Sequence, residues 1–150
     1  MKRVLKGIGC AVIGLPAALL AGLIALFLGA VVVDELALPG YRQGVLDSLS
    51  LPAGAHVVET VSGCGNTGPT GNHTELYVAV LVSAEEGADA LRRQFPYLHN
   101  AAKEGLSTDA MDRLGLAFTE PSTATGAQKD YYILEFAKEA PLSDFDLRGH

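Results

Sequence analysis

Residues 7–33 read GIGCAVIGLPAALLAGLIALFLGAVVV, and this stretch decides how the rest of the chain is presented. None of these residues carries a charged, amide or hydroxyl side chain. At about 1.5 Å per residue a helix of this length reaches roughly 40 Å, against about 30 Å of bilayer hydrocarbon. The stretch therefore predicts a transmembrane helix that crosses the bilayer with some tilt.

Three kinds of N-terminal segment compete for this stretch. A cleavable signal peptide has an apolar core of about 7–15 residues followed by a small-x-small cleavage site. Here the core is nearly twice as long, and the nearest candidate site begins with Leu28. A lipidated cysteine would follow the apolar core, whereas Cys10 lies near its start. The sequence favours an uncleaved signal anchor, with a secreted domain behind a long cleaved signal peptide as an alternative.

The charges that flank the stretch predict its orientation. Residues 1–6 form a basic tail with three Lys or Arg residues and no acidic one, whereas Asp34 and Glu35 follow the stretch. Because cytoplasmic flanks are enriched in Lys and Arg, we expect a cytoplasmic N-terminus and an extracytoplasmic remainder. The predicted location is the cell membrane, as a single-pass protein, and the richness in Ala, Gly, Leu and Val is typical of bacteria.

Small residues recur along one side of the predicted span at spacings of three or four. Such a face lets two membrane helices approach closely, so the sequence predicts a possible homodimer through it. The residues of this small-residue face are Gly14, Ala18, Gly22, Ala25 and Gly29.

The part of the chain beyond the stretch is acidic. The whole chain has 11 Lys plus Arg and 17 Asp plus Glu; three basic residues precede residue 7, so the remainder carries (11 − 3) − 17 = −9. An acidic domain repels phosphate backbones, so no nucleic-acid partner is expected. Its length suits one small domain rather than two.

The segments on either side of this domain are predicted to be a helical linker and a flexible tail. Residues 34–50 read as a juxtamembrane helical linker that Pro39 and Gly40 interrupt. After the break, the apolar residues of 41–49 recur at helical spacing, which predicts a short amphipathic helix that packs on the domain or lies on the membrane surface. Residues 141–150 read as a flexible C-terminal tail.

Residues 51–140 are predicted to form an acidic α+β domain. Residues 56–62 and 74–82 alternate and are rich in β-branched residues, so each predicts a strand, and the two form a hairpin. The second is apolar on both faces, which is typical of a central strand. The glycine-rich residues 63–72 between them do not open a helix, so no nucleotide site is predicted.

Two helices are predicted in the second half of the domain. Residues 83–95 form the main packing helix, which Ser83 and Glu86 begin as a capping box and Pro96 stops. Thr108 caps a short helix that ends at Leu114.

Two further strands complete the predicted domain. Residues 130–137 alternate strongly, and residues 114–118 alternate over a shorter length, so both predict strands, with an exposed turn at 120–128 between them. The fold class is therefore α+β: one N-terminal transmembrane helix, then a small extracytoplasmic domain with an antiparallel sheet and one main packing helix.

The candidate site residues are few. Cys64 and His73 bracket the glycine-rich loop, and an imidazole that takes the thiol proton would make a nucleophile. With His56 they offer thiolate and imidazole groups, which suit zinc. Neither set has a diagnostic spacing. The sequence therefore predicts no catalytic, metal or cofactor site, and these residues are retained as candidates only.

The predicted function is a non-enzymatic, membrane-tethered binding or accessory module with a protein partner. A thiol-dependent enzyme or redox protein that uses Cys64 is the alternative of a different class. Asp144 and Asp146 are expected to lie too close to the C-terminus to be held in place for catalysis.

Overall fold

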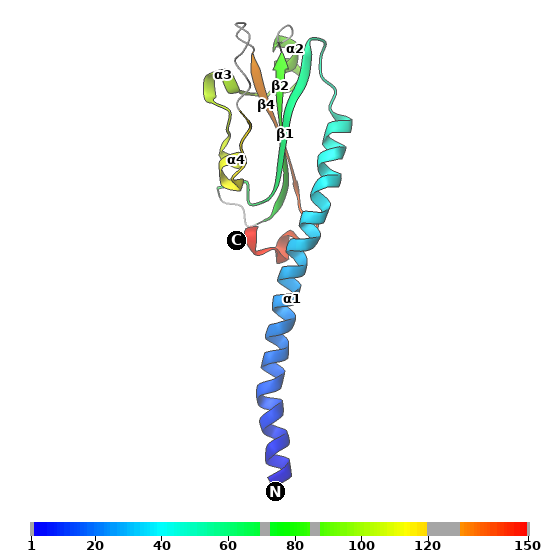
Figure 1. Cartoon of the computed structure of the whole chain (residues 1–150), viewed down its shortest axis with the longest axis vertical. Helices are drawn as coiled ribbons and strands as arrows, with labels where there is room; N and C mark the ends of the chain where they lie inside the picture. The colour runs from blue at the N-terminus through cyan, green and yellow to red at the C-terminus, as the bar shows by residue number, and fades with distance from the viewer. Residues whose placement is uncertain (1, 70–72, 85–87, 120–129, 150) are drawn as a thin grey trace.

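The computed structural model describes residues 2–69, 73–84, 88–119 and 130–149 (Figure 1). The predicted turn at 120–128 lies outside them. Among the described residues, one long apolar N-terminal helix, α1 (Lys2–Ser48), leads into a four-stranded antiparallel sheet. The predicted α+β class is confirmed at this level.

Helix α1 is continuous, so the predicted break at Pro39 and Gly40 is wrong. A proline inside a helix removes one backbone donor at a cost of about 3 kcal/mol. The turns after Pro39 offset this cost because they reach the domain, where Val45 is buried in the core and Tyr41 packs beside it. The φ angle of Gly40 is not positive, so this residue acts as an ordinary helical position rather than a turn.

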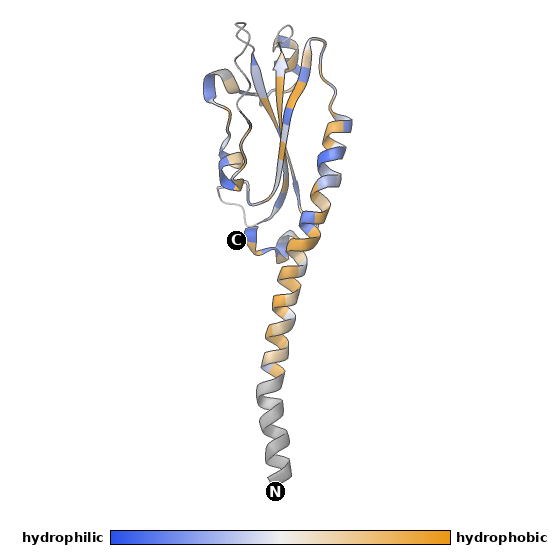
Figure 2. Cartoon of the chain, in the orientation of Figure 1, coloured by the Kyte–Doolittle hydropathy of each residue, from blue (hydrophilic) through white to orange (hydrophobic). Residues whose placement is uncertain are grey.

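The part of α1 between Leu15 and Gly29 stands clear of the domain and is apolar (Figure 2). Leu15 is 67% exposed and Leu28 is 63% exposed, and burial in the domain begins at Ala30. Among the described residues, α1 is the helix long and apolar enough to cross a membrane, a property that an N-terminal signal sequence shares.

The sheet has the order β1-β2-β4-β3, with every neighbouring pair antiparallel. The β1–β2 hairpin and the strand at 130–137 are confirmed, although β1 extends into the predicted loop as far as Gly65. The strands are β1 (Ala55–Gly65), β2 (Glu75–Ala84), β3 (His99–Asn100) and β4 (Tyr131–Glu139).

Strand β2 is central, as its two apolar faces predict, and it separates two layers of core. On one face Val80 packs with Val45 of α1 and Leu91 of α2 (Ala88–Gln94). On the other face Leu81 packs with the segment that contains α3 (Ala101–Glu104) and α4 (Asp109–Leu114). The last turns of α1 therefore provide the main packing helix, rather than the predicted helix at 83–95.

The predicted capping box is wrong at Ser83. This residue lies in β2, paired with His56 of β1 and Tyr131 of β4, because the ladder continues past the apolar run. Glu86 lies outside the described residues. The predicted end of the helix before Pro96 is confirmed, since α2 ends at Gln94.

The capping residues of α4 are the ones that the sequence predicts or favours. The side chain of Thr108 accepts a hydrogen bond from the Met111 amide and caps α4, as predicted, and Gly115 ends the helix in the left-handed conformation that glycine favours. Residues 116–119 are not a strand, so the strand predicted at 114–118 is wrong. Their alternation reflects packing instead, because Phe118 is buried against the sheet and Thr119 is held by the Glu59 carboxylate.

The predicted flexible tail is also wrong. Residues 143–149 form two short 3-10 helices, η1 (Ser143–Phe145) and η2 (Leu147–Gly149), beside α1 at the base of the domain (Figure 1). We call residues 142–148 the base segment. Ser143 and Asp146 are buried, so polar contacts that sequence periodicity does not register hold the base segment in place.

Candidate functional site

The base segment is fixed by a charged cluster that joins three parts of the chain. Asp146 is fully buried and accepts hydrogen bonds from three nitrogens of Arg148. The backbone N donates to Oδ1 (3.0 Å), Nε is shared between Oδ1 (3.0 Å) and Oδ2 (3.1 Å), and Nη2 donates to Oδ2 (2.6 Å). Arg148 also pairs with Glu35 of α1, and the Leu142 amide donates to Asp34 Oδ1 at 2.9 Å. We call these side chains, with Cys64, the base cluster.

Electrostatics in the base cluster favour a charged Asp146. The hydrogen bonds from Arg148 are the largest cause and lower the pKa of Asp146 against the opposing effect of burial. The cluster thus ties the C-terminus to α1 at the level of Asp34 and Glu35. The sequence reasoning missed it because it joins residues more than 100 positions apart.

Cys64 belongs to the base cluster but not as an activated nucleophile. Its Sγ lies 3.4 Å from Nη2 of Arg148, yet burial raises the pKa of the thiol to about 11. A thiol with that pKa is protonated at neutral pH and attacks slowly. Among the described residues no hydrogen bond joins Cys64 to His73, whose imidazole instead pairs with Asp144.

The three candidate metal ligands do not come together. His56 pairs with Ser83 at one end of the β1–β2 ladder, and Cys64 pairs with Leu76 near the other. Eight residues of strand separate them by about 27 Å, so one ion cannot bind both.

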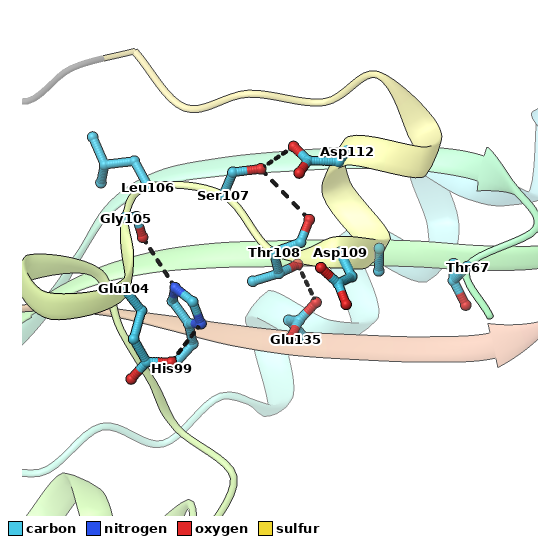
Figure 3. A pocket seen from close by; sticks show the side chains of 11 residues that line it. Thr67, His99, Glu104, Gly105, Leu106, Ser107, Thr108, Asp109, Asp112 and Glu135 are labelled. Atoms are coloured by element: carbon cyan, nitrogen blue, oxygen red, sulfur yellow. Dashed lines mark hydrogen bonds and ion pairs between the residues drawn. The ribbon is translucent and has the colours of Figure 1, made fainter. Parts of the chain in front are cut away.

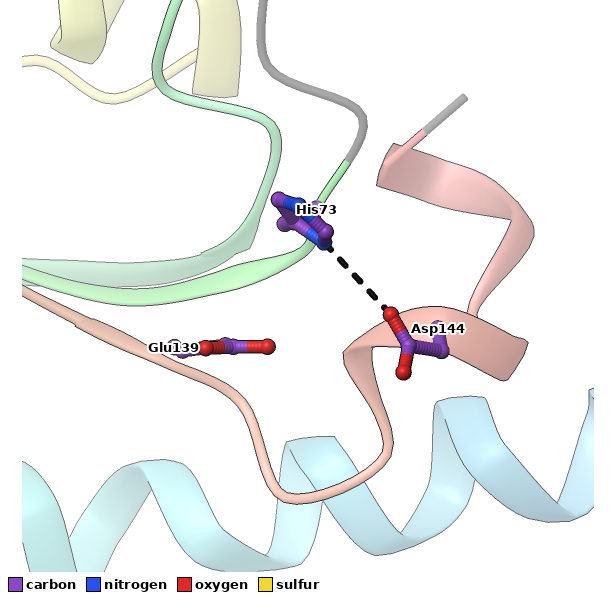
Figure 4. A group of neighbouring side chains, drawn as sticks. All are labelled: His73, Glu139 and Asp144. Atoms are coloured by element: carbon purple, nitrogen blue, oxygen red, sulfur yellow. Dashed lines mark ion pairs between the residues drawn. The ribbon is translucent and has the colours of Figure 1, made fainter.

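His73 does lie in a different group of possible ligands, with Glu139 and Asp144 (Figure 4). Their ligand atoms all lie within 4.8 Å of one another, and all three side chains are exposed. His73 Nδ1 is 3.5 Å from Asp144 Oδ1, and Glu139 accepts from Ser143 Oγ at 2.7 Å. These contacts explain the grouping without an ion, although one nitrogen and two oxygens could bind a divalent cation weakly.

A polar cleft of about 750 Å³ lies on the other side of the sheet, between α3, α4 and β4 (Figure 3). Its charged lining is acidic apart from one histidine. These side chains are His99, Glu104, Asp109, Asp112 and Glu135. The sequence reasoning missed the cleft because residues 97–107 lack a clear periodicity.

The hydrogen bonds in the cleft support structure more than catalysis. Glu135 accepts from Thr108 Oγ1 at 2.6 Å and from the buried Tyr77 hydroxyl, and burial raises the pKa of Tyr77. His99 Nδ1 lies 3.3 Å from Glu104 and its Nε2 lies 3.0 Å from the Gly105 carbonyl oxygen, so both ring nitrogens are engaged and neither is free to act as a base. The Ser107 hydroxyl, however, donates to Asp112 rather than to the imidazole. The arrangement is best suited to binding a cationic or hydrogen-bond-donating group.

Comparisons with protein-family models, with curated proteins and with solved structures find no match to this chain.

Proposed function

We propose that this chain is a single-pass, membrane-anchored, non-enzymatic module that presents an acidic binding domain outside the membrane. The observation that carries the proposal is the continuity of α1, which is apolar and largely exposed from Leu15 to Gly29 and part of the domain core at Val45. One helix thus serves as both anchor and scaffold, so the domain has a fixed height and orientation.

The flanking charges support an extracytoplasmic domain. The tail before residue 7 is basic, and the first charged residues after the apolar stretch, Asp34 and Glu35, are acidic. Cytoplasmic flanks favour Lys and Arg, so the domain belongs on the far side of the membrane from the N-terminus.

Protease accessibility on intact cells, with a tag placed after His150, tests this topology. We expect the tag to be removed while the N-terminal segment stays in the membrane after alkaline extraction. A tag that is protected in intact cells contradicts the orientation. Mature protein in the medium that begins near residue 31 contradicts the anchor and establishes the secreted alternative.

The acidic cleft is the binding surface that we propose for this module, and cationic groups are the ligand class that it fits. A lysine-rich peptide probe should bind the full chain with an affinity that falls as salt is added. Glu104→Gln and Asp109→Asn should weaken binding, whereas Asp89→Asn on the exposed side of α2 should not. Equal effects of all three substitutions would remove the cleft as the site.

A second copy of the chain is the further partner that we propose, through the small-residue face. Gly22 and Gly29 have no atom within 4 Å of where a side chain would start, so this face is open in a single chain. Crosslinking in membranes should give dimers that Gly22→Leu reduces and Leu20→Ile, on another side of α1, does not. Crosslinking that gives only monomer removes this partner.

The thiol-dependent alternative has less support. The pKa of Cys64, raised to about 11 by burial, is the reverse of what an activated cysteine needs.

A further inference from the structure

The base segment exposes two large apolar side chains while it buries two polar ones. Ser143 and Asp146 are buried and Asp144 is exposed, whereas Phe145 is 43% exposed and Leu147 is 58% exposed. Segments that face water place polar groups outside and large apolar groups inside. This segment is held in place by the base cluster, so the exposure of its apolar side chains is a fixed feature of the fold.

The base segment lies where α1 leaves the domain. The Leu142 amide binds Asp34, and Arg148 pairs with Glu35, so the segment is fixed at the level of these two residues. Figure 1 shows the segment at the end of the domain from which the apolar part of α1 extends.

The length of the apolar stretch places that level at the membrane surface. Residues 7–33 reach roughly 40 Å as a helix, and a bilayer with its headgroup regions is about 40–45 Å thick. If Lys6 lies at the cytoplasmic surface, Asp34 and Glu35 lie at the outer headgroup boundary. Phe145 and Leu147 are then at the same depth.

We propose that Phe145 and Leu147 insert into the outer headgroup region, so that the lipid surface itself is the partner of the base segment. This inference rests on the proposed membrane anchor. The domain is thereby seated on the bilayer by two contacts, α1 and the base segment, and its sheet cannot rotate freely about α1. Aromatic and large aliphatic side chains favour this interfacial position.

The charges around the base segment indicate which lipid surface it fits. The Arg148 guanidinium forms ion pairs with Asp146 and Glu35, so its charge is neutralised. The carboxylates of Asp144 and Glu139 are exposed. A surface of this kind is repelled by anionic headgroups. The contact therefore suits zwitterionic phosphatidylcholine, and its strength comes from the apolar side chains.

Tryptophan fluorescence tests the contact directly, because the chain contains no tryptophan. Phe145→Trp and Leu147→Trp each introduce one fluorophore into the full chain, reconstituted in phosphatidylcholine vesicles with acyl chains brominated near the headgroup. We expect both variants to lose emission relative to unbrominated vesicles and to show a blue-shifted maximum. Because the two exposed sites are substituted separately, the test does not depend on one variant folding.

Two controls separate this inference from the proposed function. Tyr97→Trp replaces a 98% exposed side chain near β3, about 20 Å along the sheet from the base segment, and should not be quenched. Leu28→Trp lies within the apolar part of α1, near its outer end and at the depth of the brominated positions, and should be quenched. If Leu28→Trp is quenched but the two base variants behave like Tyr97→Trp, the lipid contact is overturned and the anchor stands. An unquenched Leu28→Trp overturns the anchor and this inference together.

Discussion

The ion pair between Asp146 and Arg148 holds the base segment in its folded position. Asp146 is fully buried, and both of its oxygens accept from Arg148. Removing one partner of a buried ion pair leaves an uncompensated charge, which costs several kcal/mol. The two residues therefore hold the C-terminus against α1 more firmly than their position near the end of the chain indicates.

Arg148→Met should destabilise the chain by about 3 kcal/mol, because it strands the Asp146 carboxylate in a buried site. Chemical denaturation of the full chain in detergent measures the effect. Arg93→Met, on the exposed side of α2, is the matched control and should change stability by less than about 0.5 kcal/mol. Equal small effects of both substitutions would mean that the base segment is not fixed by this pair.

The same carboxylate makes a defined contribution to the pH dependence of stability. Its pKa is lower in the folded chain than the ordinary value of 3.8, chiefly through the Arg148 hydrogen bonds. A lowered pKa stabilises the fold above the unfolded value, and this stabilisation is lost as the pH falls through the folded value. Asp146→Asn should therefore lower the free energy of unfolding most at neutral pH. Below pH 3.8 the difference between the variant and the wild type should become small. A difference that does not change with pH would contradict the role of the ionised carboxylate.

Cys64 should react slowly with alkylating reagents. With Cys10→Ala to remove the other thiol, the rate of iodoacetamide modification should rise with pH toward a midpoint near 11, against about 8.5 for a free cysteine. A midpoint at or below that of free cysteine would restore the thiol-dependent alternative.

At the scale of elements, hydrophobic alternation predicted the sheet well because each strand buries a repeating face. β2 and β4 were found from residues such as Val80 and Leu134, which pack on one face of the sheet while the residues next to them in the strands pack on the other. The Thr108 cap was found for a similar reason, since a cap is a local hydrogen bond. Features that depend on residues close together in the sequence, such as strand alternation and helix caps, can thus be predicted from the sequence.

The elements that sequence reasoning missed depend on contacts between distant residues. Pro39 and Gly40 are local breakers, but burial of Val45 carries the helix through them. The base segment leaves Phe145 and Leu147 exposed, and it is fixed by contacts with Asp34 and Glu35 of α1, more than 100 positions earlier in the chain. The acidic cleft likewise forms only when β4 brings Glu135 beneath α4.

Gly40→Ala should stabilise the chain by about 0.5–1 kcal/mol, because a glycine inside an exposed stretch of helix costs backbone entropy. No atom lies within 4 Å of the added methyl group. Thermal unfolding of the full chain measures the change. Gly115→Ala is the contrasting variant, since its φ of +65° strains any side chain, and it should destabilise. If Gly40→Ala also destabilises, residue 40 is a turn and α1 is interrupted there.

At the scale of the whole molecule, one continuous helix joins the apolar stretch to the domain. Helix α1 continues beyond the apolar stretch, contacts the base segment at Asp34 and ends just after Val45, which lies in the core. Two separate contacts along one helix restrict rotation and bending of the domain relative to α1. This rigidity is what the proposed membrane-anchored module needs, because it would hold the acidic cleft at a set distance from the bilayer.

Hydrogen exchange on the full chain in phosphatidylcholine nanodiscs measures both the continuity of α1 and its placement in the bilayer. We expect slow exchange over residues 7–33, which the bilayer protects, and equally continuous protection over residues 34–48, where helical hydrogen bonds and packing replace the protection by lipid. Fast exchange at residues 36–42 would place a hinge between the anchor and the domain and contradict the single continuous helix. Fast exchange over residues 7–33 would contradict the membrane anchor itself.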